Sequence, residues 1–232
     1  MANGYVIYRG PSMLDGAPIL VVATGFETAS RNPKTGDMIQ TWIIREDIAP
    51  TLAAKNGADA SICGDCALRF NPETGKRPCY VLVHYAPLNV FNSYHRGIYP
   101  DITLADLAHK CAGRMVRFGA YGDPAAAPHY IWEAMAQSAK GWTGYSHQWR
   151  KLDPAWQRLV MASADSLADM EAAHASGWRT FRVTAKPFEH IKGREVTCPA
   201  SKEKGASTDC ATCRACMGTA SKARVSITIA KH

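Results

Sequence analysis

The fold is decided by residues 114–146, which read RMVRFGAYGDPAAAPHYIWEAMAQSAKGWTGYS. An apolar run of strand length at 114–118 leads into a polar turn, then into a helical pattern over 128–139 and a second strand-like run at 142–146. Strand, helix and strand in this order are typical of a βαβ unit, in which the two strands are parallel. The stretch therefore predicts a parallel sheet covered by helices.

The same alternation continues on both sides of this unit. We expect helices at 104–111, 154–157 and 167–175, and strands at 159–162 and 179–183. Each predicted strand is an apolar run, as a sheet buried on both faces requires, and right-handed crossovers place such strands side by side. We therefore predict an α/β fold with a partial or complete (β/α) barrel of parallel strands. An open doubly wound sheet is the alternative that the same pattern permits.

The residues before this repeat have a different character. Strand-like runs at 5–9, 19–24 and 39–45 are separated by Gly and Pro turns, and a short helix is expected between Asp47 and the Asn-Gly pair that follows it. We expect three parts of the chain. They are a β-rich N-terminal segment over 1–60 packed on the core, the α/β partial barrel with a first cysteine loop over 61–190, and a cysteine-rich metal-binding segment over 191–232. A buried strand at Tyr80–His84 is expected to lead out of the cysteine loop.

Composition indicates a cytoplasmic protein that does not enter a membrane. The N-terminus lacks a basic stretch followed by an apolar run, and no segment approaches the roughly 18 apolar residues of a membrane span. Eight cysteines in such a chain would stay reduced, so their clustering favours metal over disulfides. The net charge is +7, and seven Lys and Arg side chains fall within 179–204. This basic stretch favours a partner that carries phosphate, such as nucleic acid, although a solvated basic rim would look the same.

The first cysteine cluster consists of Cys63, Cys66 and Cys79. The CxxC spacing lets two thiolates converge on one metal, and the third cysteine returns after twelve intervening residues. Three thiolates suit a zinc ion completed by a histidine, with His84 and His95 the nearest in the chain, or an iron–sulfur cluster with one open iron. A zinc knuckle that only holds its own loop is the alternative to a functional site.

The second cysteine cluster consists of Cys198, Cys210, Cys213 and Cys216. Three of these cysteines fall within seven residues, and the fourth lies upstream in a Cys-Pro pair, so four ligands can fill one metal site. The run is similar to the ligand run of bacterial ferredoxins, and zinc is the alternative. A site filled by protein ligands is expected to be structural or to transfer electrons. Cys111 ends a helix and is expected to be a small core residue.

Polar residues follow three successive predicted strands. In an α/β barrel such loops build the active site, so we expect these side chains to line one cavity that also reaches the first cysteine cluster. Asp123 could bind an amine or a ribose, and His147 with Tyr145 could move protons or hydrogen-bond a substrate. The alternatives are helix caps, turns and an ordinary histidine. The residues predicted to line the cavity are Tyr121, Asp123, Tyr145, His147 and Asp165, of which the last three are the predicted catalytic residues.

A cysteine loop ahead of a βα repeat, a Gly-Asp-Pro turn after a strand and a C-terminal cysteine cluster together resemble radical-SAM-like proteins, and most closely uncharacterised phage-encoded members. The resemblance implies that the first cysteine cluster holds a [4Fe–4S] cluster whose open iron binds S-adenosylmethionine. It also implies that the turn touches this cofactor, through Tyr121, Gly122 and Asp123. The second cysteine cluster would match the accessory cluster that some members carry. A phage protein would act in the host cytoplasm.

These observations lead to two main hypotheses. The first is an iron–sulfur, radical-SAM-like redox enzyme of phage type that acts on a small-molecule or nucleoside-like substrate. The second is a non-catalytic α/β protein that is stabilised by zinc and binds nucleic acid or another phosphate-rich partner. An enzyme of another class that uses zinc at the mouth of the barrel is a third possibility.

Overall fold

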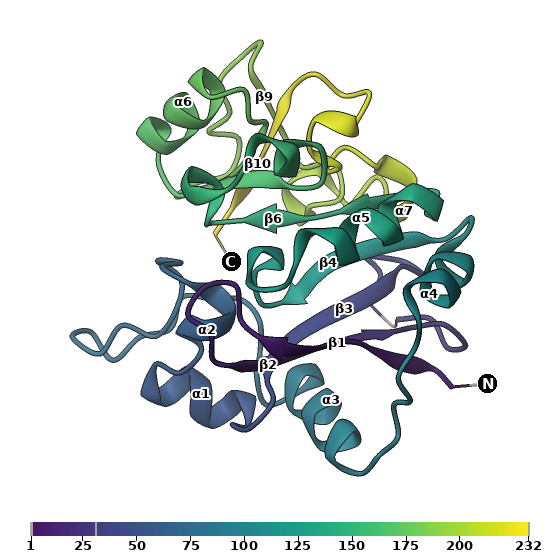
Figure 1. Ribbon diagram of the computed structural model, residues 1–232. Helices are drawn as coiled ribbons and strands as arrows, with labels where there is room; N and C mark the ends of the chain where they lie inside the picture. Colours follow the sequence, from purple (N-terminus) through teal and green to yellow (C-terminus); the bar gives the residue numbers. More distant parts are fainter. Residues whose placement is uncertain (1, 31, 232) are drawn as a thin grey trace.

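The structure is a computed structural model that describes residues 2–30 and 32–231, and it is an α/β protein with two five-stranded sheets (Figure 1). In sheet A the first three strands are antiparallel, while the third, fourth and fifth are parallel. Its order along the sheet is β1 (Gly4–Pro11), β2 (Pro18–Thr24), β3 (Ile39–Arg45), β4 (Met115–Tyr121) and β5 (Gly141–Thr143). The strands expected in the N-terminal segment thus form one side of the same sheet as β4.

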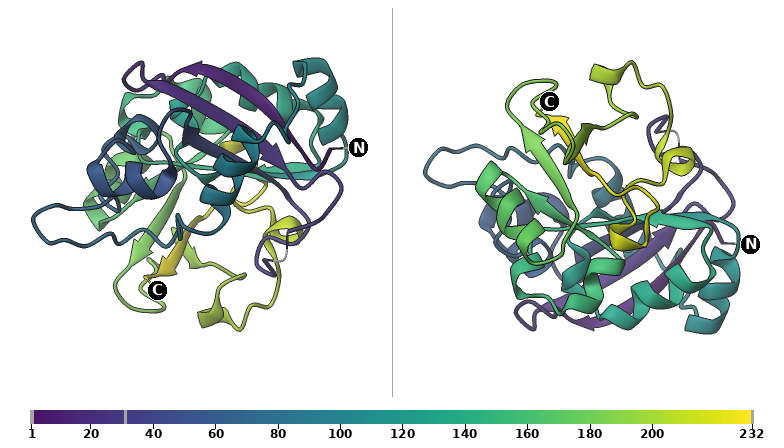
Figure 2. Two further views of the ribbon diagram at one scale, coloured as in Figure 1. Left: turned by 90° about the horizontal axis from the view of Figure 1, so that it is seen from below. Right: turned by 90° about the horizontal axis from the view of Figure 1, so that it is seen from above.

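All neighbouring strands of sheet B are parallel. Its order is β6 (Tyr145–Ser146), β7 (Met161–Ala164), β8 (Thr180–Thr184), β10 (Ser226–Ala230) and β9 (Glu195–Thr197). Both views of Figure 2 show β10, in yellow, beside the green strand β8. The segment expected to be a separate cysteine-rich part therefore contributes two strands to sheet B.

The two sheets meet at Gly144, which separates β5 of sheet A from β6 of sheet B. Its carbonyl accepts a hydrogen bond from the amide of Met161. A Cβ at this position would lie 2.9 Å from Val160 Cγ1, so the residue has to be small. The α/β class is confirmed, with a mixed sheet A and an all-parallel sheet B, and the described strands of the two sheets do not close into a barrel.

Two of the predicted helices begin at a side-chain cap. Thr103 accepts a hydrogen bond from Asp106 N at the start of α4, and Ser166 does the same for Asp169 N in α6. The α-helices are α1 (Pro50–Asn56), α2 (Ala60–Cys63), α3 (Ala86–His95), α4 (Leu104–Cys111), α5 (His129–Ser138), α6 (Leu167–Ala175) and α7 (Cys210–Cys213). The short 3-10 helices are η1 (Pro124–Ala126), η2 (Trp149–Lys151), η3 (Pro154–Arg158), η4 (Lys202–Lys204) and η5 (Gly218–Ala220).

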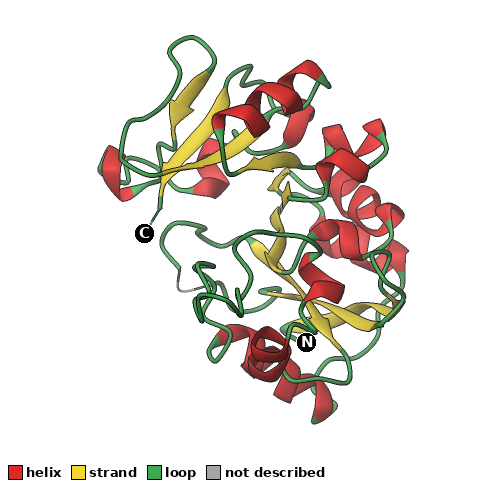
Figure 3. Cartoon of the chain, turned by 90° about the vertical axis from the view of Figure 1, so that its left-hand side faces the viewer, coloured by secondary structure: helices red, strands yellow, loops and turns green. Residues whose placement is uncertain are grey.

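The main core lies between sheet A and its helices. Strand β4 alternates, so Val116 and Phe118 are fully buried and Phe118 packs on Trp132 of α5 with a ring-centre distance of 5.2 Å. Cys111 is also fully buried there, as expected for a core residue. Arg117 points to the other face of β4 by the same alternation. In Figure 3 helices lie on more than one side of the strands, and long loops gather in the lower left part of the molecule.

Two strand predictions are wrong. Residues 142–146 are not one strand, because Gly144 divides them between β5 of sheet A and β6 of sheet B. Residues 80–84 form no strand, and Tyr80, Leu82 and His84 are exposed. Arg77 instead donates a hydrogen bond to the carbonyl of Val81 at 2.7 Å, which occupies backbone that a strand would need. Apolar side chains at this position therefore cover the surface rather than fill a sheet. Within the described part of the chain, no helix is long and apolar enough to cross a membrane.

Candidate metal centres and the adjoining cavity

The first cysteine cluster lies on one loop that begins at the end of α2. Gly64 has φ 57° and ψ −131°, and the amide of Cys66 turns back to the carbonyl of Cys63 at 3.3 Å. A Cβ on Gly64 would lie 2.4 Å from Gln148 Nε2, so only glycine fits both the backbone and the space. The loop returns when the amide of Cys79 donates to the carbonyl of Leu68 at 2.9 Å. This hydrogen bond closes the loop that carries the three cysteines.

Arg69 holds this loop in place. Its guanidinium binds the fully buried carboxylate of Asp59 at 2.7 Å and donates to the carbonyls of Gly64 and Gly57 at 2.8 and 2.7 Å. This half-buried arginine, with a carboxylate and two carbonyls as partners, has most of its donors satisfied. The sequence analysis missed both residues, although an Arg within the cysteine loop was a visible signal.

Burial raises the pKa of the Cys63 thiol well above its ordinary value, and the nearby Asp59, Cys66 and Cys79 raise it further. Burial also raises the pKa of Tyr121, with Cys63 as the next cause. Cys63 therefore lies close enough to Cys66 and Cys79 for them to disfavour its thiolate. Metal binding would have to displace their protons, which is how thiolate sites gain affinity as pH rises.

His147 directly follows β6 and contacts the first cysteine cluster. Its Nε2 lies 3.7 Å from Cys66 Sγ and 3.5 Å from Asp165 Oδ2. Burial alone would lower the pKa of His147, but Asp165 and Cys66 raise it to about 10. His84 is exposed against the ring of Tyr85, and His95 Nε2 lies 3.1 Å from the carbonyl oxygen of Glu46. The histidine beside this cluster is therefore His147 rather than one of the two nearest in the chain.

A cavity of about 330 Å³ adjoins this contact, at the carboxyl ends of β6 and β7. Two ion pairs border it, one between Lys151 and Asp65 at 2.7 Å and one between Arg150 and Asp169. His147 and Asp165 both line it, and the imidazole and carboxylate lie 3.5 Å apart on its wall. The lining residues are Asp65, Ala67, His147, Gln148, Arg150, Lys151, Ser163, Asp165 and Asp169.

The other residues predicted for this cavity lie elsewhere. The buried carboxylate of Asp123 accepts hydrogen bonds from the amides of Ala125 and His147 at 3.0 and 2.8 Å, so it holds the turn and the backbone of His147. Tyr121 is buried, and a Cβ on Gly122 would lie 2.6 Å from Ile43 Cβ. None of these three residues lines the cavity, and their predicted contact with a cofactor remains a prediction.

The second cysteine cluster lies against sheet B. The amide of Cys198 at the end of β9 donates to the carbonyl of Thr228 in β10 at 2.8 Å. Cys210 and Cys213 begin and end α7, and Arg214 has φ 53° where the chain turns toward Cys216. Three of the cysteines share an apolar cluster with side chains of the sheet, among them Met161, Ile227 and Ile229.

The pKa of Cys216 is raised to about 12, chiefly by burial. A hydrogen bond with Tyr145 acts in the opposite direction, while Cys198, Cys210 and Cys213 raise the pKa further. All four thiols thus lie within electrostatic reach of one another. Tyr145 packs on Phe181 of β8 with a ring-centre distance of 4.5 Å, and the pKa of its phenol is raised by burial and then by Cys216. Tyr145 therefore belongs to the second cysteine cluster rather than to the cavity beside His147.

The donor chemistry of both clusters suits thiolate-bound metals. Among residues 2–30 and 32–231, no three or more His, Cys, Asp and Glu side chains form a group positioned to hold a metal ion, so ligation remains a prediction. Tyr121 Oη and Arg77 Nε, near the first cluster, are buried and have no hydrogen-bond partner in that part of the chain. Donors of this kind suit the sulfurs of a negatively charged metal–thiolate centre.

The sequence analysis also missed Arg117, although a charged residue within an apolar strand run is an unusual feature. Its guanidinium donates a hydrogen bond to Tyr80 Oη at 2.6 Å, and Tyr80 directly follows Cys79 in the chain. Burial alone would lower the pKa of Arg117, but Tyr80, Tyr145 and Cys210 raise it. One cation therefore binds Tyr80, the chain neighbour of Cys79, and lies within electrostatic reach of Cys210 of the second cluster.

The fold and these two sites define an α/β protein with two separate groups of cysteines, one of which borders a cavity at the ends of parallel strands. Comparison of the chain with protein-family models, with curated proteins and with solved structures found no match.

Proposed function

We propose that this protein is an iron–sulfur redox enzyme whose substrate binds in the cavity lined by His147 and Asp165. The observation that carries the proposal is the 3.7 Å contact between Cys66 Sγ and His147 Nε2 on the wall of that cavity. It joins a group of three cysteines to an acid–base side chain at the carboxyl ends of parallel strands. Catalytic residues of α/β proteins come from such strand ends.

Cys63, Cys66 and Cys79 would hold the first centre, and a [4Fe–4S] cluster there would supply or accept single electrons. Three protein ligands leave one iron open to a substrate or to S-adenosylmethionine, which the radical-SAM-like resemblance favours. His147 would hold a proton at Nε2 with Asp165 as its counter-charge, ready to donate it to a ligand in the cavity. The two sheets joined at Gly144 would correspond to part of the barrel of that family.

The second cysteine cluster offers four thiolates and no open position, which suits electron transfer. Tyr145 would hydrogen-bond a ligand sulfur, and such bonds raise the reduction potential of a cluster. Arg117, which binds Tyr80 and lies within electrostatic reach of Cys210, would stabilise the negative charge of both clusters.

A second candidate function is supported by the same contact. His147 beside Cys66 would complete a Cys₃His set, and that set is typical of structural zinc. The protein would then be a zinc-stabilised module without catalysis, and its basic surface would bind a phosphate-rich partner.

Metal analysis separates the two functions. The protein is purified without oxygen, its iron and zinc are measured per chain, and absorbance is recorded at about 400 nm, where iron–sulfur clusters absorb. Brown protein with about four irons per centre supports the enzyme. Colourless protein with zinc and no iron, even after attempted reconstitution, would contradict it.

Cysteine variants show which centre holds the metal. Cys66→Ala should remove the metal of the first centre and leave that of the second. Cys111→Ala is the matched control, because Cys111 is buried in the main core and outside both clusters. Full loss of metal in Cys111→Ala, or full retention in Cys66→Ala, would contradict the assignment of ligands.

A further inference from the structure

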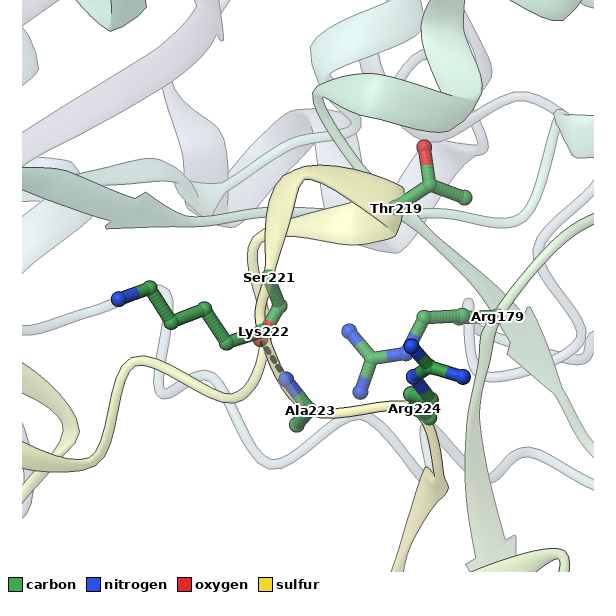
Figure 4. Close-up of a pocket in the computed structure, with 6 residues that line it drawn as sticks. All are labelled: Arg179, Thr219, Ser221, Lys222, Ala223 and Arg224. Carbon is green, nitrogen blue, oxygen red and sulfur yellow. Dashed lines mark hydrogen bonds between the residues drawn. The ribbon is translucent and has the colours of Figure 1, made fainter.

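A second pocket, of about 570 Å³, is formed by the turn that follows the second cysteine cluster (Figure 4). It shares no lining residue with the cavity beside His147. Figure 4 shows the side chains of Arg179 and Arg224 directed to the same region of this turn, and Lys222 extending outward from it. The lining residues are Arg179, Thr219, Ser221, Lys222, Ala223 and Arg224.

The turn is held rigidly on both sides. Gly218 has φ 51°, and a Cβ there would lie 2.2 Å from the carbonyl oxygen of Gln157, so the turn is pressed against η3. Arg179 of the adjoining sheet donates to the carbonyls of Ala215 and Gly218 at 2.8 and 2.7 Å, and to that of Val225. The floor of the pocket is therefore set before any ligand arrives.

Arg179 has a donor that the protein leaves unused. The residue is 9% exposed, and its Nε has no hydrogen-bond partner within the residues described. A buried donor without a partner carries a free-energy cost that a ligand oxygen or a water molecule would remove. Because Arg179 lines the pocket, this unpaired Nε favours a ligand there that accepts a hydrogen bond.

The charge of the pocket is entirely positive. Lys222 and Arg224 are exposed and form no ion pair with any described residue, and no carboxylate is among the lining residues. The hydroxyl of Thr219 adds a further donor. Arginine side chains and hydroxyls around one pocket are typical of sites that bind phosphate oxygens.

We infer that this turn is a phosphate-binding site, and that the phosphate belongs to a nucleic acid strand or to a free nucleotide. Arg224, Lys222 and Thr219 would bind the phosphate oxygens at the surface, and Arg179 would supply positive charge beneath them. The net charge of +7 favours such a ligand over a neutral one. The inference goes beyond the proposed function and does not depend on which metal the cysteines hold.

The test compares two double variants that remove the same charge. Arg224→Gln with Lys222→Gln changes the pocket, whereas Arg96→Gln with Lys55→Gln changes two exposed cations outside it. Binding of a fluorescein-labelled single-stranded oligonucleotide is followed by anisotropy at several salt concentrations, with inorganic pyrophosphate as competitor. Circular dichroism and metal content confirm that each variant is folded.

The pocket variant should bind the oligonucleotide about tenfold more weakly, and its salt dependence should fall by about one contact or more. The control variant should stay within about threefold of the unchanged protein. Competition by pyrophosphate would support a site for free phosphate groups, and binding without competition would support a site for the nucleic acid backbone. Equal weakening in both variants, or no binding of either probe by the unchanged protein, would overturn the inference.

Discussion

Two buried polar residues, Asp123 and Gln148, fix the position of the backbone at His147 and of the cysteine loop. Asp123 accepts the amide of His147, and Gln148 Nε2 donates to the carbonyl of Cys63 at 3.3 Å and to Asp65 Oδ1 at 2.7 Å. The residues at 147 and 148 thus join the end of β6 to the loop of the first cysteine cluster. Because Gln148 fills the space that a side chain at position 64 would occupy, this loop requires glycine there.

We expect Gly64→Ala to destabilise the protein by about 2 kcal/mol or more and to weaken metal retention by the first cluster. The reason is twofold, since the backbone at Gly64 is one that only glycine adopts readily and the new Cβ would meet Gln148. Chemical denaturation followed by metal analysis measures both effects.

Gly75→Ala is the matched control, because Gly75 lies in the same loop with φ 63°, but a Cβ added there would meet no atom within 4 Å. It should cost about 1 kcal/mol, the strain of the left-handed backbone alone. Equal costs in the two variants would show that the contact with Gln148 is unimportant.

At the level of elements, the last strand decides how sheet B is assembled. β10 lies between β8 and β9, so the C-terminal end of the described chain separates two strands that precede it in sequence. Arg182 of β8 and Glu195 of β9 bind each other across β10 through two hydrogen bonds at 2.8 and 2.7 Å. Both residues are buried, so this ion pair helps to enclose β10.

Glu195→Gln should destabilise the protein by about 3 kcal/mol at pH 7, because it leaves the buried Arg182 without a charged partner. Burial alone would raise the pKa of Glu195, but Arg182 and the amide of Ile191 lower it. Because the pKa of Glu195 is lower in the folded state, its ionisation stabilises the fold at pH values above the unfolded pKa of about 4.3. This stabilisation is lost as the pH falls through the pKa of the folded state. The difference between the two proteins should therefore shrink below about pH 4.

The measurement is the free energy of unfolding in urea from pH 7 to pH 3. Glu133→Gln serves as the control, because the side chain of Glu133 is 43% exposed and its contact with His129 is long, at 3.9 Å. That variant should change stability by less than about 0.5 kcal/mol. A Glu195 variant with the same stability as the control would show that the buried pair contributes nothing net.

For the molecule as a whole, Gly144 joins sheet A to sheet B. Arg117 donates a hydrogen bond to Tyr80, the chain neighbour of Cys79, and lies within electrostatic reach of Tyr145 and of Cys210 in the second cluster. A single cation therefore contacts the segment that carries the first cluster and also acts on the second, although the two are far apart along the chain.

Arg117→Gln should lower metal retention by both clusters, since it removes the positive charge that faces them and the hydrogen bond to Tyr80. Tyr80→Phe removes only that hydrogen bond, so it should affect the first cluster and leave the second unchanged. Dialysis against a chelator, followed by metal analysis, measures retention. Retention equal to that of the unchanged protein in both clusters of Arg117→Gln would contradict this role.

The sequence by itself determined the local elements and the grouping of the cysteines. The helices Leu104–Cys111 and Leu167–Ala175 lie where predicted, because their caps and apolar patterns are local signals. Only the tertiary structure decided which groups meet across the chain. Cys66 and His147 are 81 positions apart, and they come together because parallel strands end at one edge. Spacing along the chain carries no such information, and for that reason it favoured His84 and His95 over the histidine that lies beside the thiol.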